Sequence, residues 1–305
     1  MNRLHCAALV ILATAVLASP VPALAQDAIA ELFHPDSKWE LVGEGYKFTE
    51  GPAVDRAGNV FFSDPADSKI HKAAVDGKVT LFDENTGNTN GLMFGPDGKL
   101  YGCRNADKQI VAYDPDGKRH VVAEGAGSND IVVSSKGHIW FTDRNEQMPK
   151  QSHLQHVSPE GKMRSVATGW RPNGVILLPD EKTLVATNSD APQLHAFKVA
   201  EDGSLTPDGF YKPLKTPPNR GVAGSDGMTV DDEGRLYLAS YVGLQVYGPD
   251  RAFMGIIEKP ENKFLSNVVF GGPEFDYLYV TLADKVYRRK MSVKGTPYFL
   301  RGATK

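Results

Sequence analysis

"EGPAVDRAGNVFFSD", Glu50 to Asp64, is the stretch that decides the fold, because its pattern recurs along the chain. It opens with a polar residue, continues as a short apolar segment, turns through Asp and Gly, and ends in a second apolar segment. Five later segments repeat this order and start 39 to 53 residues apart, at Asn90, Asn129, Asn173, Asp226 and Asn267. Self-similarity with a period of about 40 residues predicts a repeat architecture.

Each interval between these segments contains a second hairpin pattern, such as "KIHKAAVDGKVTLF" from Lys69, built around Asp-Gly, Glu-Gly or Lys-Gly. No long segment has helical periodicity. Six units of four short strands predict an all-β fold, a six-bladed β-propeller with four antiparallel strands per blade. A β-sandwich or two stacked sheets is the alternative, but neither requires such a period.

Closure of the ring needs one strand from outside the six units. "KWELVGEG", Lys38 to Gly45, is similar to the strand that precedes each later opening residue. We expect it to join the last blade and so tie the two ends of the chain together. "TPYFL", from Thr296, competes for the same outermost position.

The first 25 residues have the pattern of a secretory signal peptide. Arg3 is followed by the apolar run "AALVILATAVLA" and by the small residues Ala23 to Ala25. This run is too short to span a bilayer. We therefore expect residues 1–25 to be cleaved and residues 26–305 to form one domain, exported to the periplasm or secreted and free of the membrane. A retained N-terminal anchor is the alternative.

Charge and cysteine content limit the binding partners and the disulfides that this chain is expected to have. The 305 residues carry a net charge of −3 with no basic stripe, which argues against a nucleic-acid partner. Of the two cysteines, Cys6 lies in the leader, so Cys103 is left alone and no internal disulfide is expected. Cys103 ends an apolar segment and is interpreted as buried packing.

The opening residues of the six units are expected to form one ring, because the first strand of each propeller blade lines the central channel. All six side chains carry oxygen, and none is Lys, Arg, His or Cys: Glu50, Asn90, Asn129, Asn173, Asp226 and Asn267. Asn-Gly and Asp-Gly also form turns, but Glu50 is not a turn former. Two carboxylates among amide oxygens predict one divalent cation, Ca²⁺ first, with Mg²⁺ or Mn²⁺ also suited and Zn²⁺ less so.

Four motifs carry a family resemblance over about residues 40 to 290: "FTEGPAVD", "NDIVVSSKGHIWFTD", "RPNGVILLPDEKTL" and "SDGMTVDDEGRLYLA". They resemble the senescence marker protein/regucalcin/gluconolactonase family, and its bacterial exported lactonase-like members in particular. The resemblance implies a six-bladed propeller with one divalent metal on its axis. Some sugar-lactone members carry an Arg just before the Asn-Asp pair, where this chain has "GAGSND".

Carried over by motif, the resemblance implies Glu50, Asn173 and Asp226 as metal ligands. It implies that Asn129 contacts substrate or completes the metal shell through water. Asp226, or the neighbouring acidic residue Asp130, is implied as the general base.

These residues predict a metal-dependent hydrolase, most simply one that opens a small, sugar-derived or other lactone. The cation would polarise the carbonyl while a carboxylate activates water. A phosphotriesterase-like activity on the same site, or an exported propeller that binds a metal or ligand without catalysis, stays open. Asn129, Asn90 and Asn267 are expected at the substrate end of the channel. Arg220, on the long segment before Asp226, is expected either in a lid or as a solvated loop residue.

Overall fold

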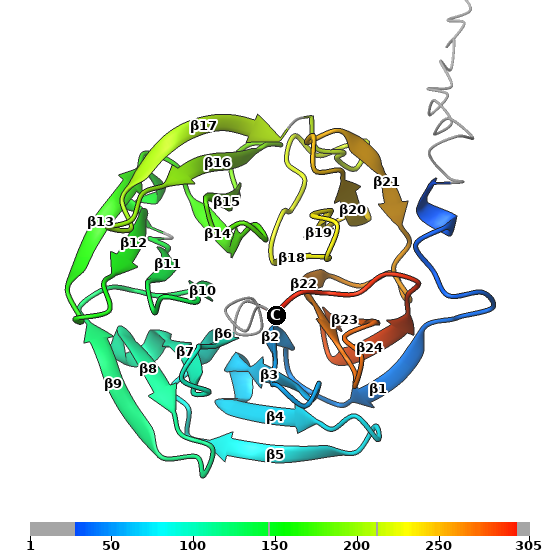
Figure 1. Cartoon of the computed structure of the whole chain (residues 1–305), viewed down its shortest axis with the longest axis horizontal. Helices are drawn as coiled ribbons and strands as arrows, with labels where there is room; N and C mark the ends of the chain where they lie inside the picture. The colour runs from blue at the N-terminus through cyan, green and yellow to red at the C-terminus, as the bar shows by residue number, and fades with distance from the viewer. Residues whose placement is uncertain (1–27, 146, 212, 298–305) are drawn as a thin grey trace, which may run out of the picture.

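Six four-stranded antiparallel sheets surround a central channel in the computed structural model (Figure 1). The structure describes residues 28–145, 147–211 and 213–297, so the predicted signal peptide, residues 1–25, lies outside the described residues. The sheets follow one another around the ring in chain order, which confirms the predicted six-bladed β-propeller. Within the described ranges, no helix is long and apolar enough to cross a membrane.

In blades one to five, the four strands are consecutive in sequence and run from the channel outward. Blades one and two comprise β2 (Glu50–Val54), β3 (Val60–Asp64), β4 (Lys69–Ala73), β5 (Val79–Glu84), β6 (Thr89–Phe94), β7 (Leu100–Arg104), β8 (Gln109–Tyr113) and β9 (Arg119–Glu124). Blades three and four comprise β10 (Ile131–Val133), β11 (Ile139–Asp143), β12 (His153–Val157), β13 (Met163–Thr168), β14 (Pro172–Leu177), β15 (Thr183–Asn188), β16 (Leu194–Val199) and β17 (Leu205–Tyr211). Blade five comprises β18 (Met228–Val230), β19 (Leu236–Ser240), β20 (Gly243–Tyr247) and β21 (Phe253–Ile257). Single 3₁₀ turns are η1 (Pro65–Asp67), η2 (Asn105–Asp107) and η3 (Pro149–Gln151).

Blade six is built from both ends of the described chain. Its strands are β22 (Leu265–Gly271), β23 (Tyr277–Leu282), β24 (Lys285–Lys290) and, outermost, β1 (Glu40–Glu44). β1 pairs antiparallel with β24, with Leu41 opposite Tyr287. The expectation for "KWELVGEG" is therefore confirmed. The segment after β24 runs instead toward the centre of the ring, where Thr296 and Pro297 line the channel (Figure 1).

The apolar core lies between the blades, because each sheet presents both faces to its neighbours. Trp140 of blade three shows this arrangement: it packs in a cluster that continues into blades four and five, and its Nε1–H donates to the carbonyl of Gly203. Ile29 and Leu32, ahead of β1, complete the cluster between blades five and six. Cys103 is fully buried, as the sequence predicted.

Removal of the closing strand is expected to destabilise the whole ring. A chain that starts at Tyr46 lacks β1 and exposes the unpaired edge of β24, and it also uncovers the cluster that Ile29 and Leu32 complete. We expect its melting temperature to fall by about 10 °C or more, or the protein to aggregate, in thermal unfolding followed by circular dichroism. A chain that starts at Lys38 keeps β1 but lacks Ile29 and Leu32. Comparing it with the Tyr46 chain separates the loss of the strand from the loss of these two core residues. Equal melting temperatures for the Tyr46 chain and the full chain would contradict this view of closure.

Candidate functional site

The opening residues lie where the inner strands are irregular. The pairing register shifts between Glu50 and Ala53 in blade one, and equivalent shifts occur in blades two, four and six. In blades three and five the inner strand begins just after the opening residue. Asn90 and Asn173 lie within strands β6 and β14, so the interpretation of their Asn-Gly pairs as simple turns is wrong. A bulge re-aims a side chain out of the regular sheet alternation, which frees these residues for a site.

Glycines behind the opening residues let neighbouring inner strands approach closely. A Cβ on Gly174 would lie 2.1 Å from the carbonyl oxygen of Asp226, and one on Gly51 would lie 2.2 Å from that of Asn90. A Cβ on Gly227 would overlap the side chain of Asn267. The bare backbone at these positions therefore keeps the ring of opening residues tight.

Substitution of one of these glycines tests the close approach. Gly174→Ala is expected to cost about 1–3 kcal/mol in the free energy of unfolding, because the added methyl group meets backbone rather than a flexible side chain. The segment that carries Asp226, just before β18, must shift, so any cation affinity of the site should fall as well. Denaturant unfolding and calorimetric Ca²⁺ titration measure the two effects. Gly221→Ala, where an added Cβ meets nothing within 4 Å, is the control; equal losses in both variants would contradict the argument.

Two buried carboxylates and two amides form the centre of the ring. Glu50 is 5% and Asp226 7% exposed. Oε2 of Glu50 accepts from the N–H of Gly51 at 3.0 Å and, more weakly, from Nδ2 of Asn267 at 3.5 Å. The side chain of Asn173 is hydrogen-bonded to Asp226. The structure thus brings Glu50, Asn267, Asp226 and Asn173 together, as the repeat alignment predicted.

Electrostatics make this centre unfavourable as an isolated anionic pair. Burial raises the pKa of Glu50, and burial together with the charge of Glu50 raises the pKa of Asp226 well above its ordinary value. Two ionised carboxylates in a buried site are stabilised when a cation lies between them. Among the described residues, no three His, Cys, Asp or Glu side chains gather as a metal centre. A cation here would therefore depend on amide oxygens for the rest of its ligands, a donor set that suits Ca²⁺.

Asp130 lies beside this centre but is held by backbone. It is 9% exposed; Oδ1 accepts from the N–H of Ile131 at 2.9 Å and Oδ2 from that of Val175 at 3.1 Å. The second bond crosses from blade three to blade four. Burial raises the pKa of Asp130 to about 7, against the opposing effect of these two amides. Because both oxygens bind backbone N–H groups, Asp130 joins two blades as well as carrying a titratable group.

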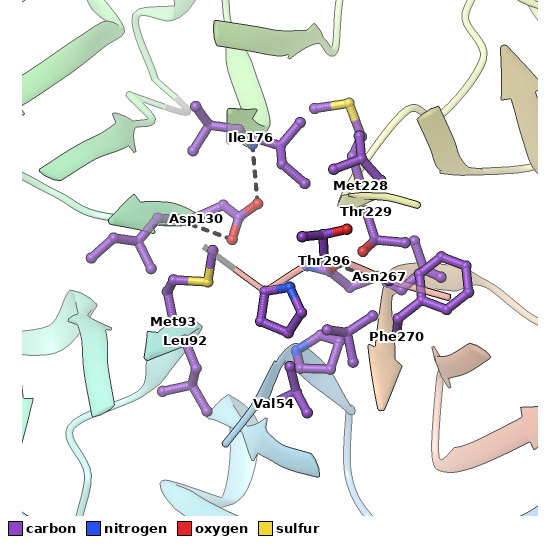
Figure 2. Close-up of a pocket in the computed structure, with 18 residues that line it drawn as sticks. Val54, Leu92, Met93, Asp130, Ile176, Met228, Thr229, Asn267, Phe270 and Thr296 are labelled. Atoms are coloured by element: carbon purple, nitrogen blue, oxygen red, sulfur yellow. Dashed lines mark hydrogen bonds between the residues drawn. The ribbon is translucent and has the colours of Figure 1, made fainter. Parts of the chain in front are cut away.

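Beyond Asp130 and Asn267 the described lining of the channel is mostly apolar, with Thr229 and Thr296 as further polar residues. Figure 2 shows Asp130 and Asn267 among side chains contributed by all six inner strands, including those of Val54, Met93, Ile176 and Phe270. The polar ring therefore sits at the end of the channel where the inner strands begin. Ligands that carry charge are expected to bind at this end.

The other predicted site residues, Asn90, Asn129 and Arg220, differ in their surroundings. Asn90 and Asn129 are opening residues with partly exposed side chains, so they remain available to a ligand. Arg220 is exposed on the long loop before Asp226, and its guanidinium lies over the ring of Tyr241, 4.5 Å from the ring centre. The contact found for Arg220 is thus with an aromatic ring rather than with a carboxylate of the site.

Sequence reasoning missed Arg144. Its positive charge lowers the pKa of both Glu50 and Asp226, which places it within electrostatic reach of the two carboxylates. It directly follows Asp143, the last residue of β11. Because β11 runs antiparallel to the inner strand, its end returns to the level of the opening residue Asn129. The sequence signal that could have identified Arg144 is a basic residue directly after the second strand of a unit.

A six-bladed propeller whose inner strands bring two buried carboxylates into a ring of amides defines a recognisable class of protein. Residues 48–284 match the family described as SMP-30/Gluconolactonase/LRE-like region, and the chain belongs to this family. A gluconolactonase of Zymomonas mobilis is 28% identical over an alignment that covers 88% of this chain and 85% of that protein. Lactonase drp35 of Staphylococcus saprophyticus is 31% identical, with coverages of 73% and 72%.

Solved structures show the same fold. A gluconolactonase from Xanthomonas campestris superposes with a TM-score of 0.75 at 24% identity, covering 87% of this chain and 92% of that one. Regucalcin from Agrobacterium tumefaciens, described as a calcium-binding protein, superposes with a TM-score of 0.73 at 19% identity, covering 84% and 94%.

Proposed function

We propose that this protein is a metal-dependent lactonase that opens a small lactone at the polar end of its channel. The observation that carries the proposal is the buried pair Glu50 and Asp226, set among amide side chains. The guanidinium of Arg144 lowers the pKa of both carboxylates, and a divalent cation would offset their charge further. Family membership supports it, because relatives along most of the chain are named gluconolactonase and lactonase.

The residues fit one divalent cation, held by Glu50, Asn173 and Asp226 with Asn129 completing the shell directly or through water. Oxygen ligands favour Ca²⁺, followed by Mg²⁺, Mn²⁺ and Zn²⁺. When bound, such an ion polarises the lactone carbonyl and stabilises the negative charge that develops on its oxygen.

The chain's own groups do the remaining work. Asp226 accepts a proton from the attacking water, and a cation bound beside it would keep its carboxyl ionised for this role. Asn267 holds Oε2 of Glu50 in place, while the partly exposed amides of Asn129 and Asn90 can orient the substrate. Asp130, whose two oxygens already bind backbone N–H groups, positions the inner strands and contributes negative charge.

Elemental analysis followed by a substrate panel tests this function. We expect about one divalent cation per chain in protein that has not met chelator. After EDTA treatment, hydrolysis of γ- and δ-lactones should disappear and return with one of the four cations. An aryl phosphotriester is assayed alongside. If only the phosphotriester is hydrolysed, the protein is a phosphotriesterase rather than a lactonase. A protein that binds no metal, and whose activity responds to none, would overturn the proposal.

A further inference from the structure

A row of three aromatic rings and one guanidinium lies on one side of the channel mouth. The ring centres of Phe48 and Phe264 are 6.1 Å apart with an interplanar angle of 22°, and those of Phe264 and Tyr241 are 5.8 Å apart at 64°. Arg220 continues the row by lying over Tyr241. These four residues, Phe48, Phe264, Tyr241 and Arg220, are called the aromatic rim below.

The aromatic rim stands at the level just outside the buried carboxylates. Phe48 precedes Glu50 by two residues, and Phe264 precedes Asn267 by three. At the rise of an extended strand, these offsets amount to about 7–10 Å. Tyr241 directly follows β19, and its N–H donates to the carbonyl of Ala223, three residues before Asp226.

The rim is confined to blades one, five and six. Two residues before the opening residues of blades two, three and four lie Asn88, Gly127 and Arg171, none of which is aromatic. Arg171 is paired with Asp190. Trp170 precedes Asn173 by three residues, as Phe264 precedes Asn267, but its ring stacks on His195 of blade four, with ring centres 4.3 Å apart. The connected row of rings therefore lies on blades one, five and six.

Hydrogen bonds hold the rim in place. The Nζ group of Lys259 donates to the carbonyl of Tyr241 at 2.9 Å and to that of Lys263 at 2.8 Å, directly before Phe264. On the other side, Oγ of Ser266 donates to the carbonyl of Thr49 at 2.8 Å. All three aromatic side chains nevertheless stay partly exposed. Their rings are therefore held in position by the fold and still have surface available to a ligand. Small-molecule binding sites are typically lined by such fixed aromatic side chains next to a few polar groups.

We infer that the aromatic rim binds an apolar or aromatic substituent of the substrate, and so selects lactones that carry such a group over small unsubstituted ones. This inference rests on the proposed function and adds a substrate class to it. A flat apolar group packs against fixed rings at little entropic cost. A polyhydroxylated substituent would need hydrogen-bonding partners that the three rings, apart from the Tyr241 hydroxyl, do not supply.

A matched pair of substrates tests the inference on the cation-loaded protein. We expect kcat/KM to be about tenfold higher for γ-phenyl-γ-butyrolactone than for γ-butyrolactone, with most of the difference in KM. In Phe264→Leu, which keeps an apolar side chain but removes the ring, this preference should fall to about twofold. Phe210→Leu, at an exposed phenylalanine on β17, should leave the preference unchanged.

Calorimetric binding of the phenyl lactone separates this inference from the proposed function. If no lactone is hydrolysed, the proposed function fails, while tighter binding by the parent chain than by Phe264→Leu would still support the rim. Equal preference for the two lactones together with equal binding by the two proteins would overturn the inference. So would a Phe264→Leu variant whose kcat/KM falls by the same factor for both lactones.

Discussion

Glu50→Gln is expected to lower lactonase kcat/KM by about a thousandfold or more in the presence of saturating Ca²⁺. Gln has nearly the shape of Glu and keeps one oxygen, but it removes one of the two charges that offset a divalent cation. Asn267 and the N–H of Gly51 then face a neutral amide in place of a carboxylate. Steady-state kinetics on the best lactone of the panel measure the loss, and circular dichroism checks that the fold is retained.

Glu201→Gln provides the control, because it makes the same chemical change at an exposed residue on the turn after β16. We expect its activity to match that of the parent protein. Asp226→Asn should be at least as damaging as Glu50→Gln, since Asp226 serves both as a ligand and as the proton acceptor. A Glu50→Gln variant with full activity that no longer depends on metal would show that the site is assigned wrongly.

Removal of the cation is expected to lower the melting temperature by roughly 10 °C at pH 8 and by much less at pH 5. The direction follows from the pKa of Glu50, which burial raises from 4.5 to about 7, and from that of Asp226, raised well above 3.8. Without a cation, the folded protein keeps protons that the unfolded chain has released. The stabilisation from these protons is complete below pH 4 and is lost as the pH rises through about 7.

Thermal unfolding in EDTA and in excess Ca²⁺ at several pH values measures this difference. Glu50→Gln should reduce both the Ca²⁺ effect and its pH dependence, because one of the two titrating groups is gone. Asp83→Asn is a useful comparison, since burial also raises the pKa of Asp83, on β5 at the outer edge of blade one. A Ca²⁺ effect of the same size at pH 5 and pH 8 would contradict the linkage.

The repeat period predicted both the architecture and the ring of opening residues. A strict order of strand, turn and strand places equivalent residues at the same height in every blade, so Glu50 and Asp226 could be brought together without any knowledge of loop structure. The contacts between Glu50 and Asn267, residues of the first and last units, follow from ring closure alone.

Features that depend on two blades at once were not predictable from the period. Asp130 accepts from the N–H of Val175 in the next blade, and the repeat period does not predict which side chain reaches across to a neighbouring blade. Arg144 and Tyr241 follow second strands, where loop conformation decides which way a side chain reaches. Arg220 could be assigned to the mouth, but its partner, an aromatic ring, is set by the fold of the long loop.

The pairing of β1 with β24 also has a consequence for biosynthesis. Leu41 and Tyr287 are neighbours across the sheet although almost the whole chain separates them. During synthesis β1 is made before the other strands and has no pairing partner until β24 has been made. Blades one to five can therefore form while β1 is still unpaired. Contacts of such high sequence separation form late and slow the final folding step. An unpaired edge is exposed for that interval, and nascent chains of this protein should depend most on chaperones just before the last blade is complete.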